Sequence, residues 1–125
     1  MNHGRHYTVD QANAALDFVG ERLERLRAAR VQLGDEEARA ALTEAGPSNG
    51  GGGAGRVVSE AFLELQRSLG ELQEMEIVLR DLDRGLVDFP TLRDGREAYL
   101  CWEEGEDEVA FWHDSESGYG GREPL

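Results

Sequence analysis

The chain has 125 residues, 39% of them hydrophobic and 31% charged, and its formal net charge is −13. This length suits one domain. Residues 57–125 carry 18 of the 26 acidic residues but only six of the 13 arginines, and so acidic a surface repels nucleic-acid phosphates and anionic membranes. We therefore expect neither a nucleic-acid partner nor a membrane partner.

The cysteine content and the N-terminal sequence bear on the cellular compartment. Cys101 is the single cysteine, which excludes an internal disulfide framework and a four-cysteine zinc site. The N-terminal sequence MNHGRHYTVDQ contains no apolar segment typical of a secretory signal. Both features are typical of proteins from a reducing compartment, so we predict a cytoplasmic protein.

The first predicted element is a helix over residues 8–45. Thr8 and Gln11 have the spacing of a capping box, in which each side chain binds the other residue's backbone N–H. Apolar residues then alternate in steps of three and four, as in a coiled-coil seam that only Arg30 interrupts; they are Ala12, Leu16, Val19, Leu23, Leu26 and Leu33. Gly34 is expected to end the regular part, with residues 35–45 as a frayed continuation.

A glycine-rich segment separates this helix from a second one. Residues 46–56 are predicted to form a flexible loop, because glycine loses much backbone entropy when it is ordered. The same three-and-four spacing resumes over residues 57–84 and predicts a second helix that ends at Gly85. Glu76 and Asp83 fall at seam positions, so either the apolar stripe rotates there or both carboxylates are partly buried. Together the helices predict a long antiparallel hairpin.

The pattern becomes typical of strands over residues 86–113, and residues 114–125 are predicted to form a tail. The runs LVDFP, EAYLCW and EVAFWH predict a small antiparallel β-hairpin or three-stranded sheet, so the fold class is α+β. A two-residue turn after Glu104 would pair Leu100 with Phe111 and place Cys101 and His113 on opposite faces. A three-residue loop would place both on one face.

Several motifs, in order, resemble a bacterial family known as domain of unknown function 2203. They are RHYTVDQANAAL, LRDLDRGLVDFP, GREAYLCW, GEDEVAFWH and SGYGGREPL. The resemblance extends from His6 to Leu125, apart from the glycine-rich loop, and implies a small α/β protein without an established activity. The chain departs from the family pattern at Glu76, where a small residue is usual, and at Glu123, where an amide is more usual.

The residues that point to chemistry are one histidine and several carboxylates in the C-terminal half. We predict a metal site formed by His113 with Asp88, Glu97 or Glu76, which suits iron, manganese or zinc. A thiolate ligand from Cys101 would favour zinc. The structural alternatives are that His113 closes the hairpin through hydrogen bonds and that Cys101 is a small buried hydrophobic residue. His3 and His6 are expected in a mobile segment and receive no role.

The function expected first is that of a non-catalytic interaction or scaffold protein. Two helices and an apolar hairpin leave more apolar surface than one short chain can cover, which predicts a homodimer. A small metal-binding protein is the alternative. A Cys–His nucleophile would need an oxyanion hole and a cleft, and no motif indicates either, so we do not expect an enzyme.

Overall fold

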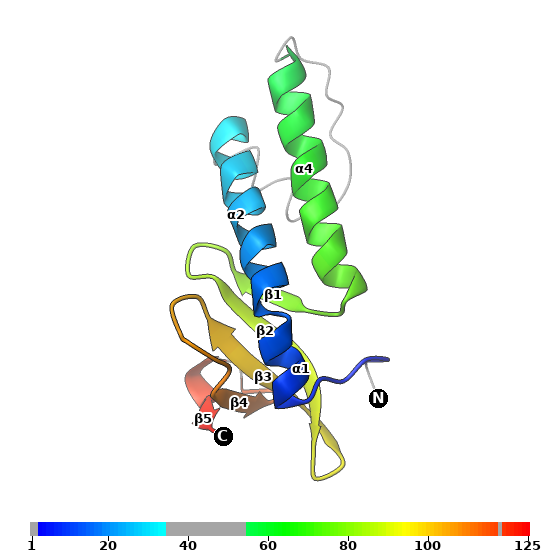
Figure 1. Cartoon of the computed structure of the whole chain (residues 1–125), viewed down its shortest axis with the longest axis vertical. Helices are drawn as coiled ribbons and strands as arrows, with labels where there is room; N and C mark the ends of the chain where they lie inside the picture. The colour runs from blue at the N-terminus through cyan, green and yellow to red at the C-terminus, as the bar shows by residue number, and fades with distance from the viewer. Residues whose placement is uncertain (1–2, 35–54, 118) are drawn as a thin grey trace.

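The computed structural model describes residues 3–34, 55–117 and 119–125, and its fold class is α+β, as predicted. Five strands form one antiparallel sheet in the order β1-β2-β3-β4-β5, and helices lie against one side of it (Figure 1). The elements in chain order are α1 (Val9–Ala14), α2 (Leu16–Leu33), α4 (Gly55–Glu74), β1 (Val78–Asp81), β2 (Leu86–Arg93), β3 (Arg96–Glu103), β4 (Phe111–Asp114), η1 (Tyr119–Gly121) and β5 (Glu123–Pro124).

The single helix predicted from residue 8 is two helices, α1 and α2, which meet at Ala15, although the predicted cap and apolar stripe are present. Thr8 and Gln11 form the capping box, with each side chain bound to the other residue's backbone N–H. The apolar stripe of α2 is buried at Val19, Leu23, Leu26 and Leu33. The helix ends at Leu33, before Gly34, which has a positive φ of 83°.

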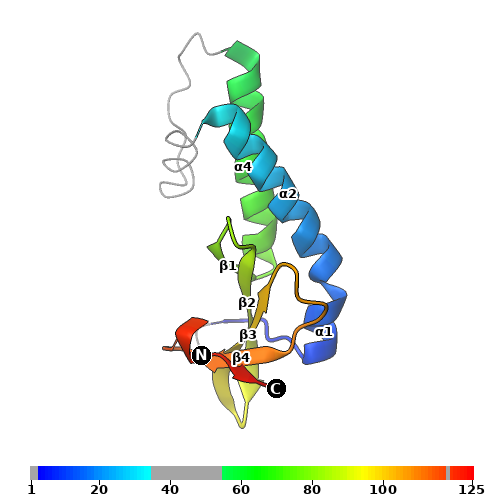
Figure 2. The same cartoon turned by 90° about the vertical axis from the view of Figure 1, so that its left-hand side faces the viewer.

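Helices α2 and α4 pack side by side and extend well beyond the sheet (Figures 1 and 2). Their packing buries Ala61, Leu65, Ser68 and Leu72 of α4. The predicted continuation over residues 35–45 and nearly all of the predicted loop lie outside the described residues, so the connection of the predicted hairpin is not described. Residues 55 and 56 of that loop belong to α4.

The prediction that the second helix continues to residue 84 is wrong, because α4 ends at Glu74 and residues 78–81 form β1. Glu76 adopts a positive φ of 58°, which no α-helix accommodates. Val78 then pairs with Asp88 across the sheet, so strand pairing replaces the helical hydrogen bonds. Gly85, with a φ of 66°, lies in the turn between β1 and β2 and does not cap a helix.

The sheet has one apolar face, which packs on the helices, and an opposite face that carries both polar and apolar side chains. Val87, Phe89, Leu100 and Trp102 form one hydrophobic cluster with the buried residues of the helices. Because side chains alternate along a strand, Asp88 of β2 and Cys101 of β3 lie on the opposite face. The candidate site lies on that opposite face, which is turned away from the helices.

The register of β3 and β4 differs from the two-residue-turn prediction. Tyr99 pairs with His113, and Cys101 pairs with Phe111, so the predicted pairing of Leu100 with Phe111 is wrong. The connection between the strands is longer than a tight turn, and Glu106 holds it by accepting hydrogen bonds from the Trp102 indole and the Glu103 backbone N–H. As in the three-residue-loop alternative, Cys101 and His113 share one face.

The C-terminal residues are part of the sheet. Strand β5 pairs with β4 at Phe111 and Trp112. The backbone N–H of Leu125 donates a hydrogen bond to the carbonyl oxygen of Ala110 over 2.9 Å. Among the described residues, the helices are too short or too polar to cross a membrane.

Candidate functional site

Three different ligand types meet on the face of the sheet that is turned away from the helices. Asp88, Cys101 and His113 come from the adjacent strands β2, β3 and β4, and Asp88 and Cys101 are direct cross-strand partners. One ligand atom of each residue lies within 4.8 Å of the other two. Each residue is at most 2% exposed. A carboxylate, a thiol and an imidazole so close together and so deeply buried form a candidate metal centre.

The imidazole of His113 is fixed at both nitrogens. Nδ1 lies 2.7 Å from the carbonyl oxygen of Asp114, and Nε2 lies 2.9 Å from Oδ2 of Asp88. A protonated ring satisfies both contacts by donating twice. A neutral ring that donates from Nδ1 leaves its Nε2 lone pair facing the site, which is the arrangement that backbone carbonyls impose on metal-bound histidines.

Asp88 has one carboxylate oxygen engaged and one without a partner. Oδ2 accepts hydrogen bonds from Nε2 of His113 and from Nε of Arg80, the latter over 2.8 Å. Oδ1 is buried and has no hydrogen-bond partner among the residues that the structure describes. A buried acceptor without a hydrogen-bond partner lowers the stability of the folded state by about 1–3 kcal/mol. A ligand that binds Oδ1 would remove this penalty, so the unpartnered oxygen indicates that the site can accept one.

Cys101 is protonated at neutral pH in this environment. Burial raises the pKa of the Cys101 thiol to about 12, and the adjacent charge of Asp88 adds to the increase. Such a thiol is a poor nucleophile, which argues against cysteine catalysis. A divalent cation reverses this effect, because a coordinating thiol loses its proton to the metal.

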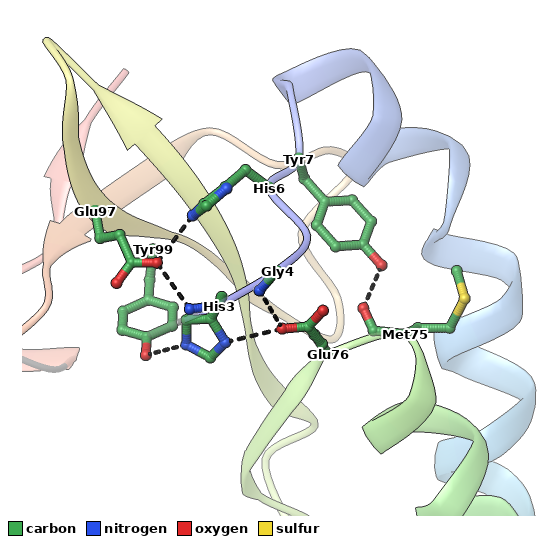
Figure 3. Close-up of polar contacts among 8 residues, drawn as sticks. All are labelled: His3, Gly4, His6, Tyr7, Met75, Glu76, Glu97 and Tyr99. Carbon is green, nitrogen blue, oxygen red and sulfur yellow. Dashed lines mark hydrogen bonds and ion pairs between the residues drawn. The ribbon is translucent and has the colours of Figure 1, made fainter. Parts of the chain in front are cut away.

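The other two predicted ligands, Glu97 and Glu76, do not join this cluster but bind the N-terminal segment (Figure 3). Oε2 of Glu97 lies 2.9 Å from Nε2 of His6 and accepts a hydrogen bond from the backbone N–H of His3 over 3.0 Å. Oε1 of Glu76 lies 3.3 Å from Nδ1 of His3 and accepts from the backbone N–H of Gly4. Two His–Glu pairs therefore hold the N-terminal segment on the sheet.

Tyr99 connects the two clusters. Its hydroxyl lies 2.9 Å from Nε2 of His3, and its ring centroid lies 5.4 Å from that of His113. The guanidinium carbon of Arg80 lies 5.2 Å from the same ring. The N-terminal segment, Tyr99 and the buried cluster thus form one continuous polar region.

His3 and His6, which received no role from the sequence, contact Glu76, Glu97 and Tyr99 in the structure. No periodicity in a short polar N-terminus could reveal them, because their partners are more than 70 residues away. The one sequence signal is Glu76, where the motifs led us to expect a small residue. Its φ of 58° is a conformation that favours glycine, and the glutamate at this position supplies an acceptor for His3 and Gly4.

The comparisons with known proteins identify the family but no activity. Residues 5–125 match the family described as an uncharacterized conserved protein, DUF2203. The chain belongs to this family, as the sequence motifs predicted. No curated protein and no solved structure matches the chain.

Proposed function

We propose that this protein binds a divalent transition metal through Asp88, Cys101 and His113. The observation that supports the proposal most directly is the buried Oδ1 of Asp88, which lacks a hydrogen-bond partner among the described residues and belongs to a cluster with a thiol and an imidazole. The two predicted ligands His113 and Asp88 keep their roles in this proposal. Cys101 takes the place of Glu97 and Glu76.

The ligand types favour zinc over iron and manganese. Zinc binds Cys sulfur, His nitrogen and carboxylate oxygen, most often with four ligands in a tetrahedral arrangement. Manganese prefers oxygen ligands, and soft thiolate favours zinc. Three protein ligands leave one coordination position for a water molecule or another small ligand. The carbonyl of Asp114, which accepts from His113, would supply the second-shell contact that orients the imidazole.

The test is elemental analysis of protein purified without a polyhistidine tag, after exposure to a mixture of iron, manganese and zinc salts. Wild-type protein should retain close to one zinc per chain. His113→Ala and Cys101→Ser should lose it. Glu97→Gln is the matched control, since Glu97 is a carboxylate of the same face that lies outside the Asp88–Cys101–His113 cluster, and it should retain zinc. Substoichiometric metal in the wild type, or equal metal in all variants, would overturn the proposal.

A spectroscopic measurement keeps the test valid if a ligand variant folds poorly. Cobalt substituted for zinc should give the absorption bands of a thiolate–cobalt bond in wild-type protein and in Glu97→Gln. A cobalt complex that shows no thiolate band would mean that Cys101 is not a ligand, which contradicts the proposed site.

We also propose, as a second function, that the protein self-associates through the extended helix pair. The observations behind this second proposal are the exposures of two large apolar side chains on these helices: Val31 of α2 is 78% exposed and Leu63 of α4 is 55% exposed. Sedimentation equilibrium at tens of micromolar should give a dimer, and Val31→Glu with Leu63→Glu should give a monomer. A monomeric wild type would contradict it. The expectation that the protein is no enzyme stays a prediction.

A further inference from the structure

The candidate metal centre is buried, and two of its neighbours lie against Asp88 and His113. Asp88, Cys101 and His113 are each at most 2% exposed, so nothing can reach them unless a neighbour moves. Arg80 binds Oδ2 of Asp88 and has a side chain that is 43% exposed. Tyr99 packs its ring on His113, and the Arg80 guanidinium lies over the same ring. Arg80 and Tyr99 therefore cover the Asp88 and His113 side of the site, and the nearby charge of Arg122 acts on Cys101.

The N-terminal segment fastens this cover. Nε2 of His3 lies 2.9 Å from the Tyr99 hydroxyl, and the His3 ring packs edge-on against the Tyr99 ring with centroids 5.7 Å apart (Figure 3). His3 itself is held by Glu76 at Nδ1 and by Glu97 at its backbone N–H. Movement of Tyr99 away from His113 would have to break or displace these contacts.

The segment is anchored firmly at one end and weakly at the other. The backbone N–H of Tyr7 donates to the Pro90 carbonyl over 2.7 Å, and the Thr91 hydroxyl donates to the Tyr7 carbonyl over 2.6 Å. By contrast, residues 3–6 make no backbone–backbone hydrogen bond within the described residues, and the Glu76 and Glu97 side chains that hold them are partly exposed. Contacts of this kind open at low free-energy cost, whereas the backbone hydrogen bonds of Tyr7 hold that end in place. Residues 3–6 can therefore swing about Tyr7, which acts as the hinge.

We propose that residues 3–6 form a latch that controls access to the Asp88–Cys101–His113 site by holding Tyr99 over His113. This inference rests on the proposed function for the identity of what enters, a metal ion. The opening itself is independent of any metal, because Cys101 is the single thiol of the chain and reports on access directly.

The experiment measures how fast methyl methanethiosulfonate modifies Cys101 in chelator-treated protein, followed by mass spectrometry. The modification rate is proportional to the population of the open form when closing is faster than reaction. His3→Ala should raise the rate about fivefold or more, because it removes two side-chain hydrogen bonds. Tyr99→Phe, which keeps the ring, should raise it about threefold. In the double variant, Tyr99→Phe should add little to His3→Ala, because both remove the same contact.

Arg25→Ala is the control, since Arg25 is exposed on α2, far along the chain from these contacts, and it should leave the rate unchanged. Unchanged rates in His3→Ala and Tyr99→Phe would overturn the latch, as would an equal increase in Arg25→Ala or full additivity in the double variant. A rate that rises in step with the globally unfolded population as urea is added would also overturn it, because Cys101 would then be reached through unfolding and not through the latch. Failure of zinc binding with these rate changes intact would refute the proposed function alone.

Discussion

Replacing Asp88 by asparagine tests how much the buried carboxylate of Asp88 contributes to the free energy of unfolding. The substitution keeps the shape of the side chain but removes the charge that faces His113, and both residues are 2% exposed. A buried hydrogen-bonding group that loses its partner costs about 1–3 kcal/mol. Asparagine can still accept one hydrogen bond, so we expect a loss of about 2 kcal/mol. The loss of the ion pair with Arg80, whose side chain is 43% exposed, adds at most about 1 kcal/mol.

The assay is equilibrium unfolding in urea at neutral pH, with a chelator present so that metal binding contributes nothing. Arg80→Gln is the matched variant, because it removes the exposed partner of Asp88 and leaves the buried one. We expect Arg80→Gln to lower the free energy of unfolding by less than about 1 kcal/mol. A loss below about 1 kcal/mol for Asp88→Asn, or equal losses for the two variants, would refute the reasoning that the buried contact between Asp88 and His113 stabilises the fold.

Three further predictions concern the turn and the thiol. Gly85→Ala should lower the free energy of unfolding by about 2 kcal/mol or more in urea, because Gly85 has a φ of 66° and an added Cβ would lie 2.5 Å from Cβ of Glu104. Zinc affinity measured by competition titration should rise about tenfold per pH unit through the neutral range, because a Cys101 thiol with a pKa of about 12 must lose its proton to bind. The same raised pKa favours the folded state below about pH 9, and this contribution is lost as the pH rises toward 12; Cys101→Ala should remove that part of the alkaline decline in stability.

The features that the sequence predicted well are those set by local chemistry. The capping box at Thr8 and Gln11 needs only four consecutive residues, and it is present. The apolar stripe of α2 reflects one face of a helix against one core, and its residues are buried. The α+β class follows from the change of period after Gly85. In each case the sequence pattern itself lies within one short segment.

The end of α4 shows where local pattern fails. Leu72, Leu79 and Leu86 continue the helical spacing, yet Leu79 lies in β1 and Leu86 in β2. Residues 77–79 are apolar and suit either structure, and the decisive contact is the pairing of Val78 with Asp88. The pairing of β1 with β2 overrides the helical periodicity of these residues. Glu76, which has a positive φ, turns the chain from α4 into β1.

The composition of the candidate site depends on the register of β3 and β4. A shift of one residue moves every side chain of a strand to the opposite face, so with the tight turn His113 would face away from Cys101. The hydrophobic pattern cannot decide between the two registers, because both faces of this hairpin carry large apolar residues. Contacts that the loop makes outside the hairpin point to the reason for the observed register: the Val109 backbone N–H donates to the Asn13 side chain over 2.7 Å, and Val109 itself is buried. Helix α1 and the loop that precedes β4 therefore help to bring a thiol and an imidazole together on the sheet's other face.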